Sequence, residues 1–176
     1  MWKAAAWFPV MVFAIDHGFS FGPVEGRSMQ PTFNPDASQM KRDIVFLNKW
    51  AAADHEFERG EVVTLMHVSF VAEVESPTDP KCMITKRVIA LQGDTVKPLR
   101  SDKTVKVPEG HCWIEGDEGF HSIDSNTFGT VPVALIKAKV TRILWPPERF
   151  GPVAKKPLSD RVKIGFIQPG VNDVWG

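Results

Sequence analysis

Short apolar runs separated by turn-forming residues repeat along most of the chain. The runs that fit β-strands are residues 43–48, 62–68, 82–91, 111–115, 133–136 and 138–144. Pro, Gly, Asn and Asp stand between them, and no long stretch keeps the period of about 3.6 residues that marks a helix. The last two runs fit either one broken strand or a turn followed by a strand. This pattern predicts a mainly β fold.

The polar stretches between these runs predict connections. Residues 51–58 form a small polar insertion, and residues 117–126 are polar and rich in turn formers. Residues 96–107 carry several lysines and an arginine, which predicts a solvated hairpin at a sheet edge, where charge discourages aggregation.

Residues 2–15 are the most hydrophobic segment of the chain. They fall short of the ~20 apolar residues that a spanning helix prefers, and Pro9 would kink such a helix. We expect residues 1–21 to form an uncleaved membrane anchor; a removed targeting segment and a buried or interfacial segment are the alternatives. Lys3 is the only charge ahead of the segment, so the positive-inside rule places the N-terminus on the matrix or cytoplasmic side.

The 176 residues suffice for one domain with a substantial core. Residues 22–147 contain all the strand-like runs and form the predicted β domain. Residues 148–176 mix Pro, Gly and charges without a sustained period, which predicts a loosely attached C-terminal tail.

Net charge, cysteines and histidines indicate which partners and bound groups to expect. The 21 basic and 21 acidic residues cancel, so nucleic acid is not an expected partner. Cys82 and Cys112 lie in strand-like runs, which favours buried thiols over a disulfide. The five histidines show no ligand spacing, and we expect no metal and no other cofactor.

Residues 26–32 (GRSMQPT) place the hydroxyl of Ser28 in a compact turn between a glycine and a proline. A serine needs a neighbouring base to act as a nucleophile, and a lysine can serve if burial lowers its pKa. Within the strand-like run 82–91, the period of two places one charge in an otherwise apolar row, made of Cys82, Ile84, Lys86, Val88 and Ala90. Arg87 points to the other face. Lys86 is therefore the candidate base, although a lone strand lysine can also simply extend to solvent.

Other serine hydrolase patterns fit less well. The GxSxG pattern fails at Gln30 and the SxxK pattern fails at Pro31. A Ser-His-Asp triad is not excluded by spacing, and His111 and His121 are formal candidates for its base.

Four motifs in order resemble those of type I signal peptidases. Residues 26–32 resemble the serine box, residues 59–63 the strand box that follows it, residues 86–94 the lysine box, and residues 116–129 the last box. Together they span roughly residues 22–147. The short chain, the sequence HSIDSN at 121–126 and the sequence ILWPP at 143–147 most resemble the mitochondrial inner membrane proteases of this family.

The resemblance implies an antiparallel coiled β-sheet or barrel with an N-terminal anchor, and a role for several residues. Ser28 would attack the scissile carbonyl, its backbone N–H would help to bind the oxyanion, and neutral Lys86 would carry the proton. Ser122 would orient the lysine, and Asp124 would hold the last box together. Without the family, both would be ordinary polar turn residues.

Two positions depart from the family pattern. Gly26 stands where bacterial members often carry a serine or threonine that assists the oxyanion hole. Asn126 replaces the arginine that pairs with the aspartate in many members, so Asp124 needs a neutral amide or another cation, such as Arg27 or Arg87, as partner.

The resemblance implies a membrane-bound endopeptidase of the mitochondrial inner membrane, with its catalytic domain facing the intermembrane space. Its expected substrates are precursor polypeptides, cut after small residues, and its expected partners are a homologous subunit 1 and membrane lipid. Met29, Ile84 and Val88 are candidate walls of the substrate cleft. A self-cleaving repressor-type peptidase lacks support because no helical DNA-binding segment precedes Ser28. A non-catalytic membrane-anchored β module that stabilises a partner protease is the other alternative.

Overall fold

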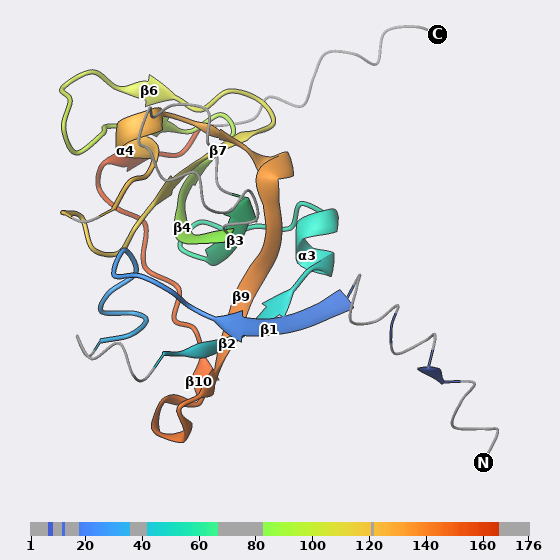
Figure 1. The fold of residues 1–176 in the computed structure, drawn as a ribbon. Helices are drawn as coiled ribbons and strands as arrows, with labels where there is room; N and C mark the ends of the chain where they lie inside the picture. The colour runs from blue at the N-terminus through green and yellow to red at the C-terminus, as the bar shows by residue number, and fades with distance from the viewer. Residues whose placement is uncertain are drawn as a thin grey trace, which may run out of the picture.

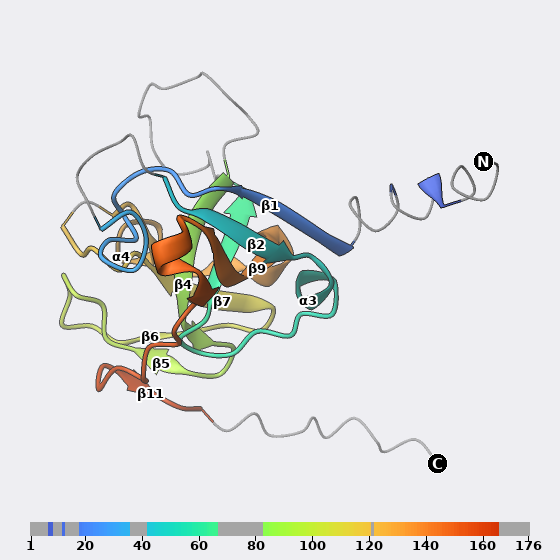
Figure 2. The same cartoon turned by 90° about the horizontal axis from the view of Figure 1, so that it is seen from below.

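A curled antiparallel sheet forms the body of the molecule (Figures 1 and 2). The computed structural model describes residues 18–35, 42–66, 83–120 and 122–165, together with Trp7, Phe8 and Val12. The strands of this sheet are β1 (Phe19–Pro23), β2 (Ile44–Asn48), β3 (Val62–Met66), β4 (Met83–Leu91), β7 (His111–Glu115), β8 (Val131–Pro132), β9 (Ile136–Trp145) and β10 (Gly151–Pro152). Their order is β1-β2-β9-β3-β4-β7-β8, and β10 pairs with β9. The expected mainly β, antiparallel fold is confirmed.

A second, smaller sheet has the strand order β11-β5-β6. It consists of β5 (Thr95–Val96), β6 (Val105–Lys106) and β11 (Val162–Lys163). Figure 2 shows these three strands together at one side of the larger sheet. The solvated hairpin predicted for residues 96–107 is thus present, but the C-terminal segment covers one of its edges.

The helices are short. They are α3 (Trp50–Ala53), α4 (Ser125–Phe128), η2 (Val133–Leu135) and η3 (Pro147–Arg149). The first overlaps the start of the predicted polar insertion at 51–58, and the second overlaps the end of the predicted polar turn at 117–126. The ambiguous runs at 133–136 and 138–144 are a single turn of 3-10 helix followed by the long strand β9.

Alternate residues of the strands point their apolar side chains into the core. On β9, Ile136, Ala138, Val140 and Ile143 are buried, and residues between them reach towards solvent. Three hydrophobic clusters result: one under β1, β2 and β9, one under β3, β4 and β7, and one between β4 and the smaller sheet. Burying apolar surface at about 25 cal/mol per Å² makes these clusters the main stabilising contribution.

The C-terminal segment up to residue 165 is packed against both sheets, which contradicts the loosely attached tail. β10 pairs with Ile143 and Arg142 of β9, and β11 pairs with β5. Arg161 forms an ion pair with Glu115 at 2.8 Å. The prediction was wrong here because two-residue strands and long-range ion pairs leave no period in the sequence. Residues 166–176 lie outside the described residues.

Most of the expected anchor lies outside the described residues. Its last three residues, 19–21, belong to β1 instead. Among the residues that the structure describes, none of the helices has the length and hydrophobicity needed to span a bilayer.

Cys112 is a buried free thiol, as expected. Its Sγ lies 3.6 Å from the Val131 carbonyl oxygen, and burial raises the pKa of the thiol to about 12. Cys82 lies outside the described residues.

Candidate active site

Lys86 is buried in the middle of β4, with 3% of its surface exposed. It pairs with Val63 of β3, and β4 is covered on its other side by β7. Its Nζ donates a hydrogen bond of 2.7 Å to Oγ of Ser122. Burial lowers the pKa of Lys86, and the nearby charge of Asp124 opposes that shift. The net effect of these surroundings is to shift the lysine towards its neutral form.

Ser28 lies in a tightly turned segment between β1 and β2, which we call the serine loop (residues 24–35). The loop folds back on itself through hydrogen bonds from the Gln30 N–H to the Arg27 carbonyl and from the Phe33 N–H to the Met29 carbonyl, both 3.0 Å. Met29 and Phe33 are buried in the cluster under β1, β2 and β9. These two apolar side chains hold the loop in place while Ser28 stays half-buried.

Gly116 lies between the backbone of Ser28 and the side chain of Ser122. A Cβ on Gly116 would lie 2.4 Å from the Ser28 carbonyl oxygen and 2.3 Å from Oγ of Ser122. The Ser28 carbonyl also accepts a hydrogen bond of 3.1 Å from the Glu118 N–H. The Ser28 backbone carbonyl and the Ser122 hydroxyl therefore both lie against Gly116, where no side chain fits, and Ser122 in turn contacts Lys86.

Asp124 caps α4 and ties the last turn to this glycine. Its carboxylate accepts hydrogen bonds from the Gly116 N–H at 2.9 Å and from the backbone N–H and side-chain amide of Asn126, each at 3.1 Å. Of the partners left open by the sequence, the neutral amide is the one observed. Arg27 is exposed, and Arg87 binds another carboxylate.

That other carboxylate, Asp117, was not singled out from the sequence. Arg87 donates two hydrogen bonds to it, at 2.8 and 2.7 Å, and both side chains are almost fully buried. Burial alone would raise the pKa of Asp117, but hydrogen bonds from Arg87, Lys156 and Thr32 outweigh it, and the pKa is lowered. Alternation along the strand predicts that Arg87 faces away from Lys86, but it does not indicate that this face is buried or that Asp117 lies there.

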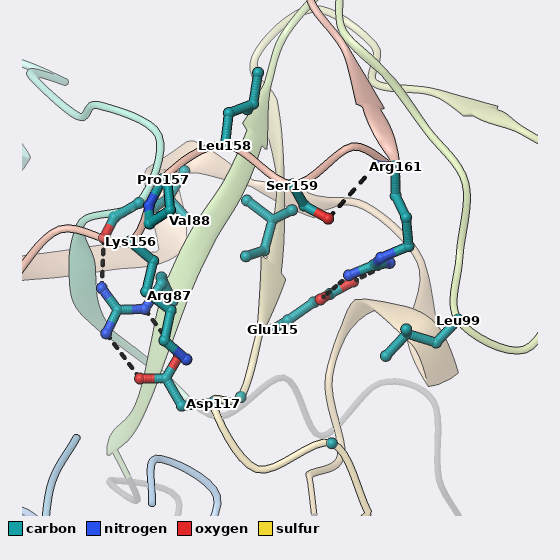
Figure 3. A pocket seen from close by; sticks show the side chains of 14 residues that line it. Arg87, Val88, Leu99, Glu115, Asp117, Lys156, Pro157, Leu158, Ser159 and Arg161 are labelled. Carbon is teal, nitrogen blue, oxygen red and sulfur yellow. Dashed lines mark hydrogen bonds and ion pairs between the residues drawn. The ribbon is translucent and has the colours of Figure 1, made fainter. Parts of the chain in front are cut away.

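A cavity of about 260 Å³ lies beside this ion pair (Figure 3). The Arg87–Asp117 pair and Lys156 stand at one end of it, and the Glu115–Arg161 pair stands at the other. Among the described residues, its lining includes none of Ser28, Lys86 and Ser122. The charged groups of this cavity are paired with one another, and we assign it no part in the candidate site.

The expected cleft residues differ in accessibility. Met29 is 2% exposed and Val88 is fully buried, whereas Ile84 is partly exposed. Only Ile84 offers surface that a bound peptide could contact directly. Of the two histidines considered as bases, His111 lies on β7 with Nδ1 2.9 Å from the Glu109 carbonyl oxygen, and His121 lies outside the described residues.

Comparison with known proteins decides the family. The sequence profile described as "Signal peptidase, peptidase S26" matches residues 2–105. The chain belongs to this family. The resemblance first indicated by the four motifs is confirmed, and with it a signal peptidase role.

Individual relatives agree with the family. The chain is 46% identical over 147 residues to mitochondrial inner membrane protease subunit 2 of Schizosaccharomyces pombe, covering 82% of this chain and 75% of that protein. It is also 46% identical over 143 residues to the Mus musculus protein of that name, covering 81% of this chain and 76% of that protein. Mitochondrial inner membrane protease subunit 1 of S. pombe is 36% identical over 130 residues, covering 73% of this chain and 74% of that protein.

Proposed function

We propose that this protein is a membrane-bound endopeptidase that removes N-terminal sorting sequences from proteins imported into the mitochondrial intermembrane space. Ser28 is the nucleophile and Lys86 is the general base. The observation that carries the proposal is the buried Lys86–Ser122 hydrogen bond beside the Gly116 contact with Ser28. A lysine with so little exposed surface and an acceptor hydroxyl is suited to proton transfer.

In the first half of the reaction, Oγ of Ser28 attacks the scissile carbonyl carbon while neutral Lys86 takes the hydroxyl proton. The resulting oxyanion is bound by the Ser28 backbone N–H. Collapse of the tetrahedral intermediate breaks the peptide bond, and Lys86 returns the proton to the leaving amine. The product of this half is an acyl-enzyme on Ser28.

In the second half, water attacks the acyl-enzyme and Lys86 again accepts the proton. The bond between the acyl carbon and Oγ of Ser28 then breaks and releases the carboxyl product, and Lys86 gives its proton to Oγ, which restores the serine hydroxyl. Ser122 keeps the amine of Lys86 directed at the reacting centre, and Asp124 keeps Ser122 and Gly116 in register. Both act through the lysine rather than on the substrate.

The names of the relatives support a location and a partner. We infer that the chain is anchored in the mitochondrial inner membrane by residues 1–21, that residues 22–147 form the catalytic domain and that this domain faces the intermembrane space. A homologous subunit 1 is its partner, and Ile84 contributes to the substrate cleft. Two relatives carry the subunit 2 name and a third the subunit 1 name, which is what supports a two-subunit complex.

The test is precursor processing by the full chain reconstituted in membranes with its partner subunit. We expect Ser28→Ala and Lys86→Met each to lower the cleavage rate by about 10³-fold or more, because each removes an essential group of the reaction. Lys137→Met, an exposed lysine of β9, is the matched control and should process normally. If the Ser28 and Lys86 variants assemble and process every precursor at the wild-type rate, the non-catalytic scaffold is the better description.

A further inference from the structure

The segment that follows β9 crosses the molecule next to the serine loop; we call residues 146–158 the C-terminal strap. It lies beyond the residues matched by the family profile and, from residue 148 on, beyond the stretch that the four family motifs span. The strap contains η3 and β10, and its Lys156 carbonyl presses on Gly60, where a Cβ would lie 2.2 Å from it. The strap is therefore fixed to the body of the protein.

One side chain of the strap reaches into the serine loop. Arg149, at the end of η3, donates a hydrogen bond of 2.6 Å from Nη2 to the Thr32 carbonyl oxygen. Its Nη1 forms an ion pair with Asp43, whose side chain is 2% exposed. A guanidinium is suited to this double contact because its donors are fixed in one plane.

Asp43 in turn binds further residues of the serine loop. It exchanges two hydrogen bonds of 2.8 Å with Asn34, which in turn donates to the Val24 carbonyl at 2.8 Å. Asn34 has a positive φ of 49°, a left-handed conformation that asparagine adopts more readily than most residues. Arg149 thus neutralises the buried carboxylate that holds both ends of the serine loop together.

The strap also binds the carboxylate that accepts a hydrogen bond from the Thr32 hydroxyl. The Thr32 hydroxyl donates to Asp117, and Lys156 of the strap donates to the same carboxylate at 2.8 Å. Thr32 lies in the turn closed by the hydrogen bond from the Phe33 N–H to the Met29 carbonyl, and Ser28 lies in the adjoining turn closed by the hydrogen bond from the Gln30 N–H to the Arg27 carbonyl. A shift of the Thr32 backbone is therefore passed directly to Ser28.

We propose that Arg149 is a positioning residue for Ser28: by holding the Thr32 carbonyl and Asp43, it fixes the serine loop at the distance from Lys86 that proton transfer requires. This inference rests on the proposed Ser28–Lys86 reaction. A displacement of about 1 Å at a reacting group can cost roughly 10²-fold in rate. Arg149 does not touch the substrate, so its loss should leave substrate binding largely intact.

The experiment compares Arg149→Met, Arg149→Lys, Ser28→Ala and Lys155→Met in the membrane-reconstituted complex. Lys155 is the matched control, because it lies in the same strap and its ion pairs go to Glu58 and Glu61, away from the serine loop. We expect Arg149→Met to lower kcat about 10- to 100-fold with KM changed less than about 3-fold, and Arg149→Lys to recover part of that loss. Lys155→Met should keep wild-type kinetics.

Hydrogen exchange separates positioning from general loss of structure. Amides of residues 28–35 should exchange faster in Arg149→Met than in Lys155→Met, while those of β3 and β4 stay unchanged. Equal kcat in the two variants, or exchange that rises equally throughout the protein, would overturn the positioning role. If Ser28→Ala retains full activity, the proposed reaction itself fails; if it is inactive while Arg149→Met is normal, only the role of Arg149 fails.

Discussion

The protonation state of Lys86 should set the acidic limb of the pH–rate profile. Burial lowers the pKa of Lys86 and the charge of Asp124 opposes the shift, so removing that charge should lower the pKa further. The base works only when neutral, and kcat/KM therefore rises as pH rises through its pKa. We expect Asp124→Asn, assayed as kcat/KM against pH, to move this limb to lower pH.

The control for this prediction is Asp102→Asn, which removes a fully exposed carboxylate in the loop between β5 and β6. Its profile should match that of the wild type. A limb that stays in place, or moves to higher pH, in Asp124→Asn would mean that Asp124 does not act on the charge of Lys86.

The surroundings of some site residues could be predicted from the sequence, and those of others could not. Strand alternation placed Lys86 in an apolar row and made it the candidate base, but it left open that the side chain extends to solvent; the structure shows it buried. The partner of Asp124 did not follow, because the choice between Asn126, Arg27 and Arg87 depends on which side of the sheet each reaches. The glycine at 26 has a local cause: its φ of +81° costs any other residue about 1–2 kcal/mol, which disfavours the serine or threonine of bacterial relatives.

At the scale of the elements, the site depends on how closely the turn after β7 approaches the serine loop. We predict that Gly116→Ala lowers cleavage by about 10²-fold, because the added methyl group would overlap both the Ser28 carbonyl and the Ser122 hydroxyl. The measurement is steady-state cleavage of a precursor peptide beside the near-ultraviolet circular dichroism of the same sample.

Gly119→Ala is the matched control, because nothing lies within 4 Å of the position its methyl group would take. It should keep wild-type activity. If Gly116→Ala cleaves normally with an unchanged fold, the loop and the turn tolerate separation, and the contact at Gly116 is not what holds the site together.

The elements were predictable where one residue pattern decides them. The strands β2, β3, β4 and β7 were foreseen within two residues or fewer of their observed ends in the described part of the chain, since their turns are marked by Gly, Pro and Asp. The two-residue strands β10 and β11 were not, because their pairing is set by partners far along the chain. The same reason hid Arg149, whose contacts join residues more than a hundred positions apart.

For the whole molecule, buried carboxylates paired with basic residues join the two sheets. Asp94 has no exposed side-chain surface and accepts two hydrogen bonds from Arg59, at 2.7 and 2.8 Å. It also accepts backbone hydrogen bonds from Leu91, at the end of β4, and from Gly165, beyond β11. One carboxylate thus connects the turn before β3, the end of β4 and the C-terminal segment.

This arrangement predicts a loss of stability in acid. Burial raises the pKa of Asp94, but the hydrogen bonds from Arg59, Leu91 and Gly165 outweigh it, and the pKa lies below its ordinary value. The pKa of Asp117 is lowered in the same way. A carboxyl group whose pKa is lower in the folded than in the unfolded state stabilises the fold above about pH 4, and this stabilisation is lost as pH falls through the folded-state pKa.

We therefore expect the free energy of unfolding, measured by urea titration, to fall steeply below about pH 4. Asp94→Asn should cost about 1–3 kcal/mol at pH 7 and flatten the acidic decline, because the variant has no proton to take up at this position. The control is Asp160→Asn, which replaces an exposed carboxylate two residues after the end of the strap. Its free energy of unfolding should match that of the wild type at pH 7 and below pH 4. An acidic decline that is equally steep in Asp94→Asn would place the acid-sensitive contacts elsewhere, with the Asp117–Arg87 pair as the next group to replace.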